Sequence, residues 1–337
     1  MTAINAATGH VQHVDYGIRA FDIGQDLRPV AELIADAFTN ELDQRGQAAL
    51  REMRIMSHIS GLLKLLNRST GEFDDVFSGF VWVEDGHVIG NVTVQRGDQY
   101  GNRWQIANVA VAPAYRGRGI ARRLMERALE HVRASHGRWA VLQVYTQNDV
   151  ARRLYERLGF EDIVGTTSLR LDRAPQAAPF PTPMPNFRSF ASGNWQPLYE
   201  LAINQHNDHA QWWRPIRRSE FQTPVEQQFG EWLWRSMGRR TVYRRCIQSA
   251  RRFEAALILT AQKWREDHEV ELWVRPQNYG QYEEQMVQWI LATLNEYPRW
   301  PVSVKLSTHH EAGLNAFRAH GFQSLTTLMT MRYQIAE

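Results

Sequence analysis

Residues 109–121 read Val109-Ala-Val-Ala-Pro-Ala-Tyr-Arg-Gly-Arg-Gly-Ile-Ala121, and the rest of the fold is predicted outward from this stretch. An apolar run from Gln105 to Val111 predicts a strand, which ends before Pro113. After two glycines, apolar residues recur at helical spacing from Ile120 to Leu129. The stretch therefore predicts a strand, a basic turn that contains glycine, and the first turns of a helix.

The turn at residues 116–119 has the features of an anion-binding site. The first N–H groups of a helix lack partners within the helix, and the helix dipole places partial positive charge there. Phosphate is the anion that most often binds at such a place. Gly117 and Gly119 have no Cβ to hold a ligand away from the backbone. The sequence thus favours a phosphate-binding turn, and the alternative is a surface loop that caps a helix.

Two common phosphate-binding motifs do not fit this turn. The dinucleotide fingerprint Gly-x-Gly-x-x-Gly would need its third glycine where the chain has Arg122. A Walker loop ends in Gly-Lys-Ser/Thr, and this stretch has no such ending. Both nucleotide-binding classes are therefore set aside.

The composition is that of an ordinary globular protein of two-domain size. The chain has 337 residues, of which 43% are hydrophobic and 22% charged. Cys246 is its one cysteine, which excludes an intramolecular disulfide and fits a cytoplasmic protein. Residues 1–15 lack the runs of a signal peptide, and no stretch has the length of a transmembrane helix, so we expect no membrane partner. The net charge of +3, without a dense basic stripe, argues against a nucleic-acid partner.

Several elements are predicted before the central stretch. A strand is expected at Ile18–Phe21, followed by a helix that Asp26 caps and that runs through Ala37. A longer helix is expected at Leu42–Leu66. The apolar runs on either side of Asp85-Gly86 predict a β-hairpin.

A second motif follows the strand predicted at residues 139–145. It reads Asn148-x-x-Ala-x-x-Leu-Tyr155-x-x-x-Gly159-Phe160, in which Asn148 can cap a helix and Gly159 can end it. A closing strand is predicted at Ile163–Leu171. Together with the turn Arg116-x-x-Gly-x-Ala121, this motif closely resembles the motif set of the GNAT N-acetyltransferases, over about residues 18–172. The resemblance implies a mixed, mostly antiparallel sheet flanked by helices, in the α/β (α+β) class, and acetyl-CoA as the co-substrate.

The same resemblance implies roles for individual residues. The backbone of the central strand would hold the pantetheine arm, the turn and Arg122 would bind the pyrophosphate, and Asn148 would bond to the arm. Tyr155 matches the family's tyrosine that protonates the departing CoA thiolate, while the alternative is an aromatic core residue on an amphipathic helix. The cofactor-binding residues implied are Val109, Ala110, Val111, Arg116, Gly117, Arg118, Gly119, Ile120, Ala121, Arg122, Asn148 and Tyr155.

The sequence does not reveal a general base. Asn108 lies on the central strand, and no carboxylate lies between Trp104 and Tyr115. The candidates near in sequence are Glu41, Asp43, His58, Glu84 and Asp85. The chain shows no ligand set at metal-binding spacing, so we expect no metal.

A proline-rich stretch at residues 174–186 predicts a linker between two domains. After it the first half is echoed at a nearly constant offset: Arg19-Ala-Phe21 by Arg188-Ser-Phe190, and Gly159-Phe160 by Gly321-Phe322. We therefore predict a catalytic domain at 1–173 and a second, GNAT-like domain at 187–337.

The second domain is expected to be degenerate. The positions of Arg116, Gly119 and Ala121 become Tyr279, Tyr282 and Glu284, so a carboxylate and aromatic rings replace the turn. The positions of Asn148 and Tyr155 become His310 and Phe317, and a phenylalanine has no proton to give. These matches predict one domain that binds acetyl-CoA and one degenerate domain that does not.

The function predicted from these observations is transfer of an acetyl group from acetyl-CoA to a primary amine of a small-molecule acceptor, by direct attack. One alternative is a non-catalytic acyl-CoA-binding or regulatory module. Another is a peptide or protein N-acetyltransferase. Twelve tryptophans leave room for an apolar interface, so the sequence also allows a homodimer.

Overall fold

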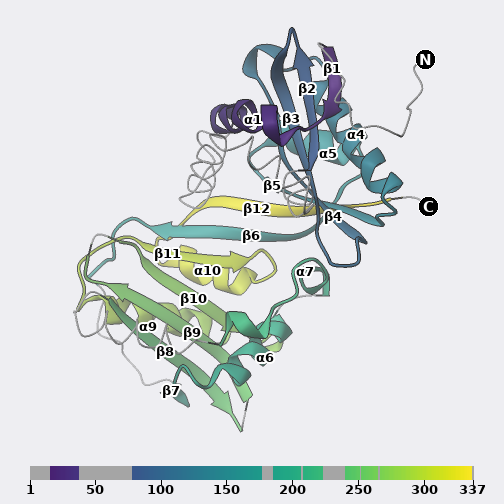
Figure 1. Cartoon of the computed structure of the whole chain (residues 1–337). Helices are drawn as coiled ribbons and strands as arrows, with labels where there is room; N and C mark the ends of the chain where they lie inside the picture. The colour runs from purple at the N-terminus through teal and green to yellow at the C-terminus, as the bar shows by residue number, and fades with distance from the viewer. Residues whose placement is uncertain are drawn as a thin grey trace. The chain divides into compact units, whose positions relative to one another are not determined.

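The computed structural model describes residues 16–37, 78–176, 185–205, 208–222, 240–250, 252–264 and 266–335. In these ranges the chain forms the mixed α/β fold predicted from the sequence (Figure 1). Its contacts divide it into two compact units, which are described separately. Unit 1 comprises Met1–Gln143, Leu154–Glu161 and Arg332–Glu337, and unit 2 comprises Val144–Arg153 and Asp162–Met331.

Some predictions fall outside the described residues. They are the helix expected at Leu42–Leu66, the candidate bases Glu41, Asp43 and His58, and residues 177–184 of the expected linker.

Five described strands make up the sheet of unit 1, in the order β1-β2-β3-β4-β5. Neighbouring strands are antiparallel except for β4 and β5, which are parallel. The expected hairpin is formed by β2 and β3, with Asp85 and Gly86 at positive φ in its turn. The strands are β1 (Tyr16–Ala20), β2 (Gly79–Glu84), β3 (His87–Arg96), β4 (Arg103–Val111) and β5 (Trp139–Tyr145).

Two helices cover opposite faces of this sheet, namely α1 (Ile23–Ala37) and α4 (Ile120–Ala134). Val81 of β2 packs with Val30 of α1, whereas the ring of its neighbour Phe80 lies under Arg127 of α4. Successive side chains of a strand point to opposite faces, so the two helices form outer layers around the sheet.

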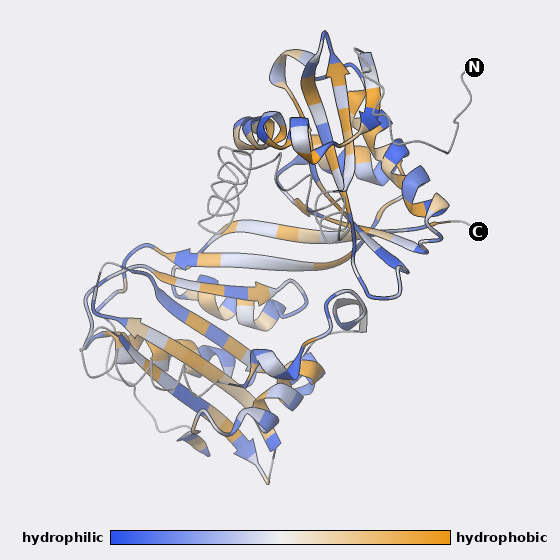
Figure 2. Ribbon diagram, viewed as in Figure 1, coloured by the Kyte–Doolittle hydropathy of each residue, from blue (hydrophilic) through white to orange (hydrophobic). Residues whose placement is uncertain are grey.

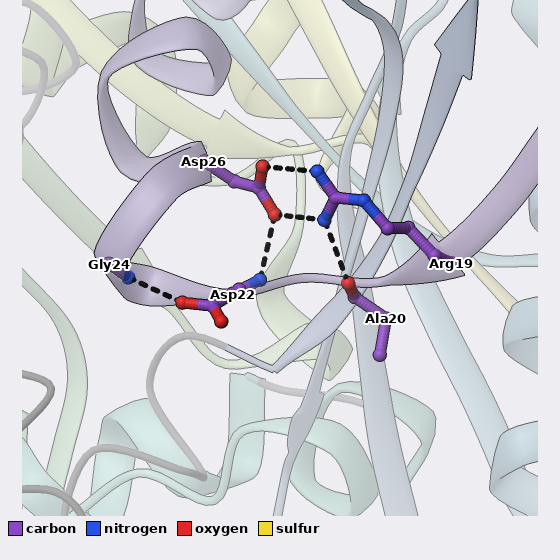
Figure 3. Close-up of polar contacts among 5 residues, drawn as sticks. All are labelled: Arg19, Ala20, Asp22, Gly24 and Asp26. Atoms are coloured by element: carbon purple, nitrogen blue, oxygen red, sulfur yellow. Dashed lines mark hydrogen bonds and ion pairs between the residues drawn. The ribbon is translucent and has the colours of Figure 1, made fainter. Parts of the chain in front are cut away.

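Helix α1 begins at Ile23, so the prediction that Asp26 caps it is wrong. Asp22 caps the helix instead, because its Oδ1 accepts the N–H of Gly24 at 2.8 Å. Asp26 is 1% exposed and accepts two hydrogen bonds from Arg19, at 2.5 and 2.7 Å, and one from the N–H of Asp22 at 2.8 Å (Figure 3). A buried carboxylate requires such partners, and the helix pattern alone does not show that β1 supplies the arginine.

Unit 2 repeats this arrangement, with its strands in the order β12-β6-β11-β10-β9-β8-β7. Here β10 and β11 pair in parallel. The strands are β6 (Glu161–Leu171), β7 (Phe187–Ser189), β8 (Arg240–Ser249), β9 (Arg252–Gln262), β10 (His268–Val274), β11 (Val302–Ser307) and β12 (Gln323–Gln334). The helices outside unit 1 are α5 (Asp149–Arg157, which continues into unit 1), α6 (Trp195–Gln205), α7 (Asp208–Trp213), α9 (Glu283–Leu294) and α10 (Glu311–Ala319).

The core of unit 2 lies on both sides of β9, which is largely apolar (Figure 2). Leu257 and Leu259 pack with Met286 of α9 on one side. Ala256 packs with Leu201 of α6 on the other side. Unit 2 is therefore also a sheet between helices.

Each unit contains residues from both halves of the sequence. Strand β6 comes from the first half, yet in unit 2 it pairs with β11, from Leu171↔Val302 to Thr166↔Ser307, and lies beside β12 (Figure 1). Strand β12 comes from the second half, yet its end, from Arg332, belongs to unit 1. The boundaries 1–173, 174–186 and 187–337 stay predictions about segments of the sequence.

Candidate active site

Strands β4 and β5 pair only at their beginnings. The parallel register runs from Arg103↔Trp139 to Gln105↔Val141. Strand β4 continues to Val111 without further pairing to β5. Beyond Gln105, strand β4 is thus no longer paired with β5.

A β-bulge lies in the part of β4 that has left β5. The register with β3 shifts between Asn91 and Thr93, where one extra residue of β4 is accommodated at Asn108. Asn108 has a φ of 51°, which few residues other than glycine adopt. The Asn91 side chain, 2% exposed, holds the bulge by donating from Nδ2 to the Asn108 C=O at 2.9 Å. The bulge redirects the strand immediately before Val109.

Sequence reasoning missed Asn91. Its signal was an asparagine within the apolar run Val88–Val94, because a buried amide must find hydrogen-bond partners.

The glycine turn has open space beside its backbone. Gly117 and Gly119 have φ values of 79° and 78°. A Cβ built on either glycine would meet no atom within 4 Å. The backbone conformation therefore requires glycine, and a ligand can approach it closely.

The first turn of α4 is uncapped and basic. Gly119 is its N-cap, no side chain caps the helix, and no acidic residue lies in the first turn. Ile120 is buried and anchors the helix to the sheet, while Arg122 is exposed. Arg116 donates from Nε to the Val111 C=O at 3.1 Å, which ties the turn to the end of β4. Unpaired N–H groups and arginines at a helix start favour a phosphate.

The structure places most of the predicted cofactor-binding residues on one continuous strand, turn and helix start in unit 1. They are Val109, Ala110 and Val111 at the end of β4, Arg116, Gly117, Arg118 and Gly119 in the turn, and Ile120, Ala121 and Arg122 in α4. Asn148 belongs to unit 2 and Tyr155 to unit 1, at the two ends of α5.

Helix α5 has the ends that the sequence predicts. Asn148 accepts the N–H of Ala151 at Oδ1, at 3.1 Å, and so caps the helix. Gly159 has a φ of 92°, and the N–H of Phe160 bonds to the Tyr155 C=O at 3.0 Å. Tyr155 is 7% exposed, and its ring centroid lies 6.0 Å from that of Phe160. The acid role of this buried tyrosine stays a prediction.

The two candidate bases that the structure describes lie in the β2–β3 hairpin. Glu84 has an oxygen 3.7 Å from Nη1 of Arg118, so it belongs with the basic turn. Asp85 is exposed in the hairpin turn, with a φ of 51°. Within the described ranges no three His, Cys, Asp or Glu side chains group as metal ligands, and the expectation of no metal stays a prediction. Nor is any helix there long and apolar enough to cross a membrane.

In unit 2 the corresponding turn is filled by a carboxylate of the chain itself. Glu283, the first residue of α9, is 1% exposed, and its Oε2 accepts the N–H groups of Gly280 at 2.9 Å and Tyr282 at 3.1 Å. Its Oε1 accepts Nε2–H of His310 at 2.8 Å. An internal anion thus occupies the place where α9 would otherwise bind a phosphate.

Further contacts fix this carboxylate. Gln205 donates to Nδ1 of His310 at 3.1 Å, and the Tyr279 ring stacks on the imidazole at 4.2 Å. Burial raises the pKa of Glu283, but the hydrogen bonds from His310 and the backbone outweigh it, so the pKa lies below its ordinary value. The sequence predicted Glu284 as the carboxylate in this turn, which is wrong: Glu284 is half-exposed and bonds to His320 at 2.7 Å.

The comparisons with known proteins agree with this geometry. Residues 38–160 match the model of the acetyltransferase (GNAT) family. N-alpha-acetyltransferase RimI of Mycobacterium tuberculosis is 40% identical over 60 residues, which are 18% of this chain and 36% of RimI. N-alpha-acetyltransferase 30 of Schizosaccharomyces pombe is 34% identical over 83 residues, which are 24% of this chain and 55% of that protein. The chain thus covers about a third to a half of these relatives.

Two solved structures resemble the chain over nearly its whole length. A GCN5-related N-acetyltransferase from Sphaerobacter thermophilus has a TM-score of 0.58 at 14% identity, covering 95% of this chain and 96% of that one. A tandem GNAT protein from the clavulanic acid biosynthesis pathway has a TM-score of 0.51 at 13% identity, covering 95% of this chain and 98% of that one. The predicted tandem fold is confirmed.

Proposed function

Since residues 38–160 match the model of the GNAT acetyltransferase family, we propose that this chain transfers an acetyl group from acetyl-CoA to a primary amine of a small-molecule acceptor. The course of β4 carries the proposal. The strand leaves β5 after Gln105, bulges at Asn108 and leads through an open glycine turn into the uncapped start of α4.

This course suits the shape of acetyl-CoA. The backbone from Val109 to Val111 would pair with the amides of the pantetheine arm. The N–H groups of the turn from Arg116 to Ala121 would bind the pyrophosphate, with Arg122 beside it. Open space at Gly117 and Gly119 supports a close approach of the phosphates to the backbone.

The reaction is a direct displacement at the thioester carbonyl. The amine nitrogen forms a bond to the carbonyl carbon, the carbon–sulfur bond breaks, and the amine gives up its proton to water. Tyr155 donates its phenolic proton to the departing thiolate, and general acid help of this kind contributes roughly a hundredfold to the rate. No covalent intermediate with the enzyme forms.

A second candidate acceptor is the N-terminal amine of a protein. The similarity to RimI and N-alpha-acetyltransferase 30 favours it. These matches span only 18% and 24% of this chain, however, and leave most of it without a counterpart in either relative. The small-molecule amine therefore stays the first candidate.

The test combines calorimetry with turnover. We expect one equivalent of acetyl-CoA to bind, NADH not to bind, and an amine panel to include a small molecule that is acetylated. Acetylation of peptide N-termini alone would select the second candidate, and binding without turnover would select the non-catalytic acyl-CoA-binding module. Absence of binding would refute both acetyltransferase candidates.

Replacing Tyr155 with phenylalanine should lower kcat roughly a hundredfold with little change in acetyl-CoA affinity.

A further inference from the structure

We propose that the end of strand β12 positions Tyr155, so that the last strand of the second sequence half is a working part of the acetyltransferase site. The inference rests on the proposed function, because it gives Tyr155 the role of acid. Unit 1 contains both Leu154–Glu161, which includes Tyr155, and Arg332–Glu337, the end of the chain.

Tyr333 is the residue through which β12 reaches this segment. Its ring centroid lies 5.4 Å from that of Phe160. A Cβ built on Gly159 would lie 3.2 Å from Cε2 of Tyr333, so the ring covers the glycine that ends α5. Any larger residue at position 159 would press on this ring, in addition to the strain of its φ of 92°.

Phe160 lies against Tyr155 as well as against Tyr333 and so connects the two tyrosines. The rings of Phe160 and Tyr155 lie 6.0 Å apart, and the Phe160 N–H donates to the Tyr155 C=O at 3.0 Å. Phe160 is 3% exposed and Tyr155 7%, so neither ring can turn without displacing its neighbours. A general acid must lie within hydrogen-bond reach of its proton acceptor, and so the rate depends on where this ring is held.

The same end of β12 is anchored in unit 1 by two other contacts. The Ile335 N–H donates to the Arg138 C=O at 2.9 Å. The Arg332 guanidinium lies 4.9 Å from the ring centroid of Trp139, the first residue of β5. Tyr333 lies between these anchors in sequence and is therefore held in place from both sides.

Within unit 2, the earlier part of β12 contacts the residues that lead into the same motif. The Leu325 C=O accepts Nε2–H of Gln147 at 3.3 Å, and the Thr327 C=O accepts the N–H of Thr146 at 2.9 Å. Asn148 follows directly. Strand β12 therefore contacts the two residues before the motif and, through Tyr333, the end of the motif at Gly159 and Phe160.

The test replaces Tyr333 in the full chain and measures steady-state acetylation. We expect Tyr333→Ala to lower kcat by roughly ten- to hundredfold, as small misplacements of catalytic groups do, with the KM for acetyl-CoA changed less than about twofold. Tyr333→Phe should retain the wild-type kcat, because the ring makes the contacts. Tyr16→Ala is the control, since Tyr16 lies on β1 of unit 1, pairs with Glu84 of β2 and contacts the Trp82 ring.

A double variant separates positioning from general destabilisation. If Tyr333 acts through Tyr155, adding Tyr333→Ala to Tyr155→Phe lowers kcat no further. The inference would be overturned if the double variant showed the product of the two single losses in kcat, or if Tyr333→Ala alone left kcat unchanged.

Hydrogen exchange distinguishes failure of the inference from failure of the proposed function. We expect Tyr333→Ala to speed exchange of the Phe160 amide, and unchanged exchange would overturn the inference. A wild-type chain that acetylates no amine would refute the proposed function, and the exchange result would still decide whether β12 holds this turn.

Discussion

Placing a negative charge in the glycine turn tests the proposed phosphate site directly. In Gly117→Glu, a carboxylate would stand where the pyrophosphate is expected to approach the backbone. Gly280→Glu is the matched control in unit 2, because both glycines have positive φ values, 79° and 85°, and open space at the Cβ position. Both variants thus add one charge and similar backbone strain, of about 1–2 kcal/mol, to the folded state.

The difference between the two variants follows from Coulomb's law. A carboxylate about 6 Å from two units of phosphate charge is repelled by about 1.4 kcal/mol at the dielectric constant of water and about 5.5 kcal/mol at an effective value of 20. The turn is exposed, so the lower part of this range applies. We expect Gly117→Glu to weaken acetyl-CoA binding by about 1.4–2.8 kcal/mol, which is roughly ten- to hundredfold in Kd. Gly280→Glu should leave the Kd unchanged, because Glu283 already fills the turn in unit 2.

The assay is calorimetric titration of each variant with acetyl-CoA, with thermal unfolding measured in parallel. Similar falls in Tm for the two variants would show that their strain is matched. An unchanged Kd in Gly117→Glu, or equal losses in both variants, would refute the assignment of the phosphate site. Binding of two equivalents of acetyl-CoA to the wild-type chain would refute the interpretation that Glu283 prevents phosphate binding at the turn in unit 2.

Three further predictions concern stability. Arg19→Ala should lower the free energy of unfolding in denaturant by about 3–5 kcal/mol, because it leaves the buried Asp26 without its charged partner. Glu283→Gln should lower Tm at neutral pH, and the difference from wild type should shrink below about pH 4.3, because the lowered pKa gives a stabilisation that is lost as pH falls. Burial lowers the pKa of His268, so the unfolded chain takes up a proton there at a higher pH than the folded chain does. The free energy of unfolding should therefore fall as pH drops below about 6.5, and His268→Gln should flatten that part of the stability curve.

Each of these changes has a control in the chain. Arg28→Ala breaks an exposed pair with Glu32 and should cost less than about 0.5 kcal/mol. The control for Glu283→Gln is Glu284→Gln, at the exposed carboxylate next in sequence, and the control for His268→Gln is His309→Gln, at an exposed histidine; each should change Tm and its pH dependence less than its partner variant does. If a control variant loses as much stability as its partner variant, burial of the replaced group does not explain the loss.

The fold and the elements that carry the candidate site could be predicted because their signals are local. Alternating apolar residues, the glycine turn and the helix ends at Asn148 and Gly159 each depend on neighbours within a few residues. The start of α1 was mispredicted because Asp26 is satisfied by Arg19 on another strand, which helix patterns do not reveal. The assignment of Glu284 failed for a related reason. Matching the two halves of the sequence at a constant offset does not show which of two adjacent side chains, Glu283 or Glu284, bonds to the backbone of the turn.

The sequence by itself determined the tandem repeat, the strand, glycine turn and helix start for which we propose acetyl-CoA binding, and the motif that carries Tyr155. Tertiary structure alone decided the bulge held by Asn91, the internal carboxylate Glu283, and the place of strand β12. These features depend on groups that are distant in sequence, such as Tyr333 and Phe160, and meet only when the strands pair. Local periodicity records which face of an element is apolar, but it does not record which partner covers that face.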